Sequence, residues 1–133
     1  MIDAKNAPYG VLLLRVSMGI LFILHGVYLK VFVFGMAGTA KFFTTLGLPD
    51  WFAWVVMLYE TIGGLALIFG IYTRWVALFL GVHLLFAAYL GSAANGWLYS
   101  SKGGGYEFPV FWAIASFALA LLVQSDERSR VSA

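Results

Sequence analysis

The sequence is dominated by apolar runs, each about as long as a helix that crosses a membrane. Such a helix needs about 20 mostly apolar residues. Four runs qualify, at about residues 11–32, 51–72, 75–94 and 108–124. Only 11% of the 133 residues are charged, and the mean hydropathy is +0.92, so little of the chain suits water. We therefore predict an all-α integral membrane protein, an antiparallel bundle of four transmembrane helices. Residues 1–124 would form one domain in the lipid bilayer, followed by a polar cytoplasmic tail at 125–133.

Two of the three connections are long enough to carry structure of their own. In the first, FGMAGTAKFFTTLGLPD, Phe42, Phe43 and Leu46 recur at helical spacing beside polar residues. This pattern predicts a short amphipathic helix in the membrane interface between the first and second spans. The third connection is rich in glycine and aromatic residues, which predicts a loop folded back at headgroup level. The second connection is short and predicts a tight antiparallel turn.

Charge and cysteine content exclude several classes of protein. The chain has no cysteine, so disulfides, thiolate metal sites and cysteine nucleophiles are excluded. The basic residues are too few and too scattered for a nucleic-acid-binding face. With four spans, both termini lie on one side, and the positive-inside rule predicts that this side is the cytoplasm. The basic residues that decide this are Lys5, Arg74, Arg128 and Arg130, against Lys41 and Lys102 on the other side.

Ionisable residues inside the apolar runs are the candidate functional residues, because they are costly in lipid and normally face the bundle interior. From the cytoplasmic ends, at about 1.5 Å per residue, His83 lies at about 12 Å, Glu60 at about 18 Å and His25 at about 21 Å. We therefore predict that Glu60 faces inward near both histidines, and these three are the candidate catalytic residues. The candidate ligand-binding residues are Arg15, Tyr59 and Glu107, and Lys30 is interpreted as an anchor that reaches the membrane surface.

Small residues share faces with these polar groups. Gly63 and Gly64 follow Glu60 by three and four positions, and Gly19 lies four residues after Arg15. Such seams let helices approach closely, and several of them on one short chain are compatible with a homo-oligomer.

Several ordered motifs resemble those of the DoxX family of small bacterial inner-membrane proteins. They are LLLRVSMGILFILHG, GTAKFFTTLGLPDWFAW, YETIGGLALIFGIYTRWVAL, NGW and GGGYEF. The resemblance implies a four-helix membrane bundle and a link to redox chemistry, because relatives include a subunit of thiosulfate:quinone oxidoreductase. Relatives often carry a histidine shortly before the asparagine-glycine pair of the third connection, whereas this chain reads LGSAANG there.

Three functions remain open at this level. The first is a quinone- or redox-linked membrane subunit that binds a small apolar ring, with His25 or His83 as hydrogen-bond donor and Glu60 as proton relay. A quinone is the expected ligand, and a partner protein must supply the electrons because no motif for a covalent or tightly held redox cofactor is visible.

The second is metal handling, of a copper type, by His25, His83 and Glu60, with soft ligands available at Met18, Met36 and Met57. The third is a scaffold or assembly subunit without chemistry, in which Glu60 pairs with Arg15 or His25 to fix the helix register.

Overall fold

The computed structural model describes residues 1–123, and this part of the chain is helical, with no β-strand. The predicted all-α class is therefore confirmed. Two of the five α-helices continue into segments wound differently: α1 into a π-helix, η1, and α4 into a shorter π-helix, η2, followed by a 3-10 turn, η3. In chain order the elements are α1 (Ala7–Ile23), η1 (Leu24–Val33), α2 (Met36–Thr45), α3 (Phe52–Phe69), α4 (Thr73–Ala87), η2 (Ala88–Ser92), η3 (Ala93–Asn95) and α5 (Glu107–Leu122).

Membrane-capable helices coincide with the predicted spans, with one difference in length. Within residues 1–123, three helical segments are long and apolar enough to cross a membrane, namely Ala7–Val33, Phe52–Phe69 and Thr73–Asn95. The fourth helix, α5, is apolar but has 16 residues, or about 24 Å against a hydrocarbon core of about 30 Å. The fourth crossing therefore stays a prediction. The predicted polar tail at 125–133 lies outside the described residues.

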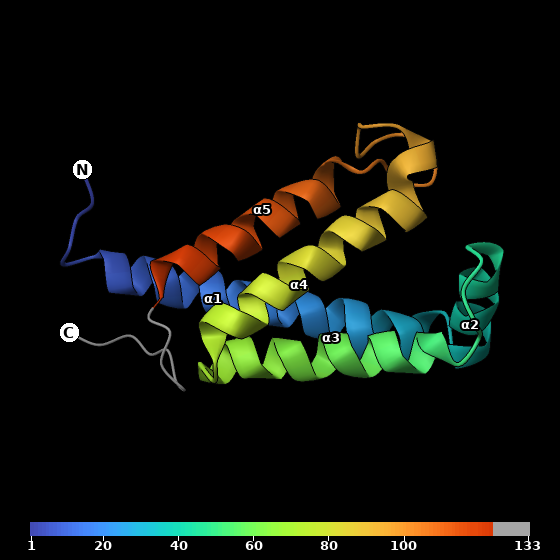
Figure 1. Ribbon diagram of the computed structural model, residues 1–133, viewed down its shortest axis with the longest axis horizontal. Coiled ribbons are helices and arrows are strands. Elements are labelled where there is room, and N and C mark those ends of the chain that lie inside the picture. The colour runs from blue at the N-terminus through green and yellow to red at the C-terminus, as the bar shows by residue number, and fades with distance from the viewer. Residues whose placement is uncertain (124–133) are drawn as a thin grey trace.

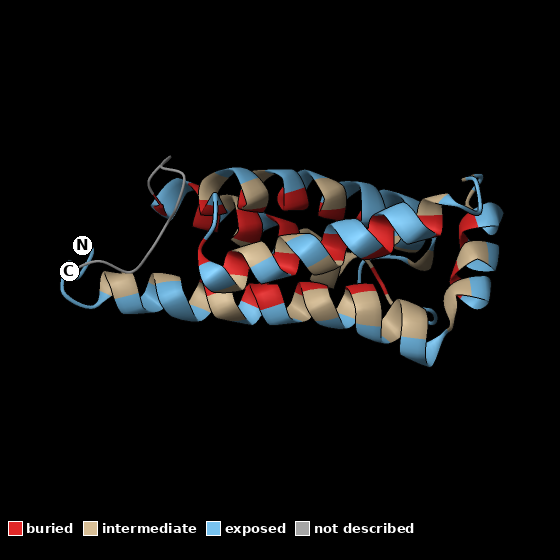
Figure 2. Ribbon diagram, turned by 90° about the horizontal axis from the view of Figure 1, so that it is seen from below, coloured by how far each residue is buried: buried red, intermediate tan, exposed pale blue. Residues whose placement is uncertain are grey.

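The long helices pack as two antiparallel pairs, α1 with α3 and α4 with α5 (Figure 1). The pairs converge at the end that carries the α3–α4 turn and diverge toward the end that carries α2 (Figure 1). Buried residues gather on the facing sides of the helices, as Figure 2 shows. The main core, which includes Phe22, Leu67, Leu80 and Leu119, fills the space between the pairs.

Glycines bring the first pair into close contact. A Cβ atom added at Gly19 would lie 2.6 Å from the Gly64 carbonyl oxygen, and one added at Gly64 would lie 2.6 Å from the Gly19 carbonyl oxygen. A Cβ at Gly26 would come within 2.7 Å of the Thr61 hydroxyl oxygen. The predicted close approach along this seam is confirmed. These contacts fix the position of α1 along the axis of α3.

The α3–α4 connection is the predicted tight turn. Gly70 ends α3 with a φ of 73°, and Tyr72 precedes α4 with a φ of 49°, both in the left-handed region. Two residues later, the Arg74 guanidinium donates to the Ala120 carbonyl at 3.1 Å and also to the Val123 carbonyl. Carbonyls in the last turn of a helix lack an N–H donor from a following turn. Arg74 supplies this donor, so it caps the C-terminal end of α5 and links it to the start of α4.

A short helix, α2, forms where the amphipathic segment is predicted, and it lies across the diverging end of the bundle (Figure 1). The Thr39 hydroxyl oxygen lies 2.9 Å from the Gly35 carbonyl oxygen and 3.0 Å from the Lys30 carbonyl oxygen. Phe43 is buried with Ala53 at the start of α3. These contacts hold α2 over the ends of η1 and α3, while its place in the membrane interface stays a prediction.

The third connection closes on itself. The Tyr106 amide donates to the Gly96 carbonyl at 3.0 Å, and the Glu107 amide donates to the Trp97 carbonyl at 2.9 Å. Asn95 adds side-chain hydrogen bonds to the carbonyls of Gly103 and Gly104. The loop therefore folds back as predicted, and its depth in the membrane stays a prediction.

Candidate functional site

Glu60, in the middle of α3, is the centre of a buried polar cluster. The Lys30 ammonium, from η1, donates to Glu60 Oε1 at 2.6 Å, and His83 Nε2, from α4, lies 3.1 Å from Glu60 Oε2. The side chains are 7% exposed for Glu60, 15% for Lys30 and 19% for His83. Because a carboxylate only accepts hydrogen bonds, His83 carries its proton on Nε2 in this contact. We call Lys30, Glu60 and His83 the polar cluster.

The position of Lys30 corrects the sequence interpretation, which made it an anchor at the membrane surface. Its ammonium instead points into the bundle and also donates to the His25 carbonyl at 2.8 Å. In an α-helix, residues five apart are separated by about 140° around the axis. A π-helix bonds each residue to the one five positions on, so η1 brings Lys30 onto the side of His25.

His25 is placed beside the polar cluster and has no hydrogen bond to Glu60. Its Nδ1 donates to the Leu21 carbonyl at 2.9 Å, and its ring packs against Trp112 with 4.8 Å between ring centroids. The bond from Nδ1 leaves Nε2 of a neutral ring as a proton acceptor. Thus His25 reaches the cluster through its backbone carbonyl, and its ring offers a separate basic nitrogen.

A large cavity opens beside these groups. Its volume is about 800 Å³, and it lies between η1, α2, α3 and the end of α4. The polar cluster and His25 form its polar wall, while the remaining lining is almost entirely apolar or aromatic. These remaining lining residues are Leu29, Phe34, Gly38, Thr39, Phe42, Phe43, Leu46, Leu48, Phe52, Val56, Phe86, Ala87, Leu90 and Gly91.

The predicted ligand-binding residues lie outside this cavity. The Tyr59 ring packs on the His83 ring, 5.2 Å between centroids, and so supports the cluster from its outer side. Arg15 is buried at 6% exposure on α1. Glu107 is the first residue of α5, and its carboxylate accepts the Tyr99 amide of the third connection at 2.7 Å. Sequence reasoning therefore brought Glu60 and His83 together, but it did not find Lys30 as the ionic partner of Glu60 or the aromatic lining of the cavity.

The described residues do not assemble the predicted set of metal ligands. Within residues 1–123, no three histidine, aspartate or glutamate side chains come close enough to hold one ion. Glu60 Oε1 is occupied by the Lys30 ammonium, whose positive charge disfavours a second cation there. Met18 is packed in the main core, where its flexible side chain fills space between the helices.

Comparison with known proteins places the chain in a family. Residues 10–93 match the sequence model of DoxX, which is more than half of the chain. The chain belongs to the DoxX family. It is 38% identical over 117 residues to a Bacillus subtilis (strain 168) protein named "Putative oxidoreductase CatD", covering 88% of this chain and 81% of that one.

A second relative carries a location in its name. It is "Inner membrane protein YqjF" of Escherichia coli (strain K12), 42% identical over 86 residues, which are 65% of this chain and 64% of the relative. No solved structure matches. The family and the apolar helices together establish a membrane protein of the DoxX family.

Both π-helical segments of the described chain border the cavity. Such segments are rare in proteins, and those that occur are often found at functional sites. Leu29 and Lys30 come from η1, and Leu90 and Gly91 come from η2. In η1, the π-helical winding brings Lys30 to the side of the helix that faces the cavity. No periodicity in the sequence indicates it.

Proposed function

We propose that this protein is a quinone- or redox-linked subunit of a bacterial inner membrane, binding a quinone or a similar redox-active ring in the cavity. The observation that carries the proposal is the polar cluster, set in the wall of a cavity that is otherwise apolar. The name of the Bacillus relative supports a redox role, and that of the Escherichia relative supports the location.

The cavity suits such a ligand in size and chemistry. Small-molecule sites typically enclose about 300–1,000 Å³ of mostly apolar surface with a few placed polar groups. At about 800 Å³, the cavity has room for a ring and part of an apolar tail. A quinone needs hydrogen-bond donors at its ring oxygens, and the Lys30 ammonium has three N–H bonds, two of which are used by Glu60 and His25.

The entrance is expected between α2 and α4, on the lipid side. Phe34, Phe42 and Phe86 line the cavity and are also 63%, 51% and 64% exposed. A group that lines a cavity and remains exposed marks where the cavity reaches the surface. An apolar molecule dissolved in the membrane can therefore enter sideways, without crossing water.

The residues of the chain would hold the ring and move protons. Reduction of a quinone to a quinol takes up two electrons and two protons. Lys30 would donate to a ring oxygen, and Glu60 with His83 would pass protons toward it, since the two already share a hydrogen bond. The electrons would come from a partner protein.

Bound quinone in purified protein tests the proposal. We expect about one quinone per chain after extraction from native protein, and much less from Glu60→Gln, which keeps the shape of the side chain and removes its charge. The matched control is Glu107→Gln, the same chemical change at the start of α5, outside the cavity. If native protein also fails to bind added short-chain ubiquinone in detergent, the proposal is refuted.

The same samples distinguish the other two functions. Stoichiometric metal that disappears in Glu60→Gln and His25→Ala would indicate metal handling instead. Absence of both ligands, with a lower melting temperature for Glu60→Gln, would leave a scaffold whose polar cluster only holds three helices together.

A further inference from the structure

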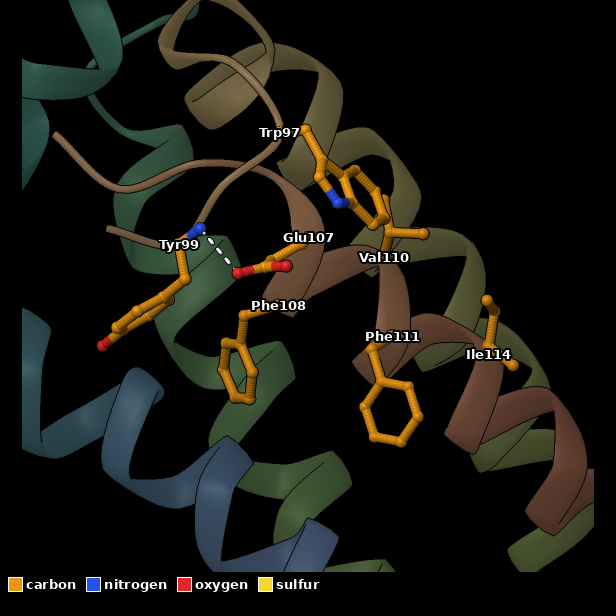
Figure 3. Close-up of a pocket in the computed structure, with 7 residues that line it drawn as sticks. All are labelled: Trp97, Tyr99, Glu107, Phe108, Val110, Phe111 and Ile114. Carbon is orange, nitrogen blue, oxygen red and sulfur yellow. Dashed lines mark hydrogen bonds between the residues drawn. The ribbon is translucent and has the colours of Figure 1, made fainter. Parts of the chain in front are cut away.

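A second hollow lies on the surface of α5, beneath the third connection (Figure 3). Its volume is about 670 Å³, and it shares no lining residue with the cavity described above. Apart from one carboxylate, the side chains that line it are aromatic or aliphatic. The lining residues are Trp97, Tyr99, Glu107, Phe108, Val110, Phe111 and Ile114.

Glu107 is the charged group of this hollow. One carboxylate oxygen accepts the Tyr99 amide at 2.7 Å, and Figure 3 shows the other oxygen directed to the side where Trp97 lies. Within the described chain, no lysine or arginine forms a salt bridge with Glu107. The carboxylate therefore has acceptor capacity for a cation from outside the chain.

Aromatic rings stand on both sides of this carboxylate. Trp97 lies on one side, and Tyr99 and Phe108 lie on the other, forming an edge-on pair with 6.2 Å between centroids. An ammonium group is attracted both to aromatic rings and to a carboxylate, so this arrangement suits a bound ammonium group. Phe111 and Ile114 follow along α5, away from the third connection, and are 67% and 58% exposed.

We propose that this hollow binds a phospholipid with an ethanolamine headgroup. The lipid ammonium would pair with Glu107 between the aromatic rings, and an acyl chain would lie along Phe111 and Ile114. The order of the groups supports this occupant, because the charge lies at the start of α5 and the apolar surface extends along the helix from it. The proposal does not depend on quinone binding.

Lipid selection by the purified protein tests this site. Native protein in detergent is mixed with equal amounts of phosphatidylethanolamine and phosphatidylglycerol of identical acyl chains, and bound lipid is counted by native mass spectrometry. We expect a roughly fivefold preference for phosphatidylethanolamine, the size typical of a surface ion pair with a cation–π contribution. In Glu107→Gln the preference should fall to about one. The glutamine oxygen can still accept the Tyr99 amide, so the loop is expected to keep its shape.

Three further measurements separate charge from shape. Asp50→Asn, the same change at an exposed carboxylate in the first connection, should leave the preference unchanged. Phe111→Ala should weaken the binding of both lipids to the same extent, because it removes only a contact with the acyl chain. For native protein, the preference should shrink between about 50 mM and 500 mM salt as the charges are screened. Equal binding of both lipids by native protein, a preference for phosphatidylglycerol, or a preference that persists in Glu107→Gln would overturn the proposal.

Discussion

The ion pair between Lys30 and Glu60 gives the sharpest test of how the bundle is held together. The perturbations are Lys30→Met, which keeps most of the side-chain length and removes the ammonium, Glu60→Gln, and the two combined. Each single change leaves the other charge buried without its ionic partner. The double change removes both charges from a site where the side chains are only 15% and 7% exposed.

The expected magnitude follows from the geometry. At the observed 2.6 Å, two unit charges attract by about 6 kcal/mol in a medium of effective dielectric constant about 20. Desolvation of both groups offsets much of this attraction, and removal of one partner from a buried pair typically costs about 3–5 kcal/mol. We therefore expect each single variant to lose about 3 kcal/mol of unfolding free energy. The double variant should lose about as much as either single one, not about 6 kcal/mol.

The assay is unfolding of the four proteins in mixed micelles, followed by loss of helical circular dichroism as denaturing detergent is added. The coupling energy is the difference between the double variant and the sum of the singles, and it should be about 3 kcal/mol. Lys41→Met is the matched control, because Lys41 is an exposed lysine on α2. It should change the unfolding free energy by less than about 0.5 kcal/mol.

An additive result would refute this reasoning. If the double variant loses the sum of the two singles, Lys30 and Glu60 do not act as a pair. A loss below about 1 kcal/mol in both singles would mean that the charges reach water in the membrane-embedded protein. The pair would then contribute as little as an exposed salt bridge.

Three other predictions concern the contacts that shape the bundle. Gly19→Ala should lose about 2 kcal/mol in the same unfolding assay, because its Cβ would lie 2.6 Å from the Gly64 carbonyl oxygen, whereas Gly10→Ala, with nothing within 4 Å, should be neutral or stabilising. Arg74→Met should lose about 2 kcal/mol by leaving the carbonyls at the end of α5 without their donor, and an unchanged midpoint would show that water replaces it. Thr39→Val should cost about 1 kcal/mol and speed amide exchange in α2, while equal exchange rates would contradict its role in holding that helix.

Much of the architecture could be predicted because local physics decides it. Long apolar runs must form helices in lipid, since every backbone polar group there needs a partner within its own segment. The turn after Gly70 and the helix around Phe43 follow from short-range signals that tertiary contacts did not override. The contact of Glu60 with His83 was also accessible, because helix rise placed the two at similar depth and burial cost directed both inward.

The composition of the site was decided by tertiary structure. Lys30 joins Glu60 because η1 is π-helical, and its winding is invisible to any reasoning based on 3.6 residues per turn. His25, at the right depth, turns its ring to Trp112 on a helix that is distant in sequence. Depth along a helix can be counted from the sequence, but rotation about its axis depends on the neighbours against which it packs.

The sequence alone therefore determined that this chain forms membrane-type helices with a buried carboxylate at mid-depth. Only the packed structure decided which cation neutralises that carboxylate and that a cavity lies beside it. The physical reason is the difference in range of the interactions. Helix formation in lipid depends on neighbours within a few residues, whereas the partner of a buried charge and the space beside it depend on how separate helices pack against one another.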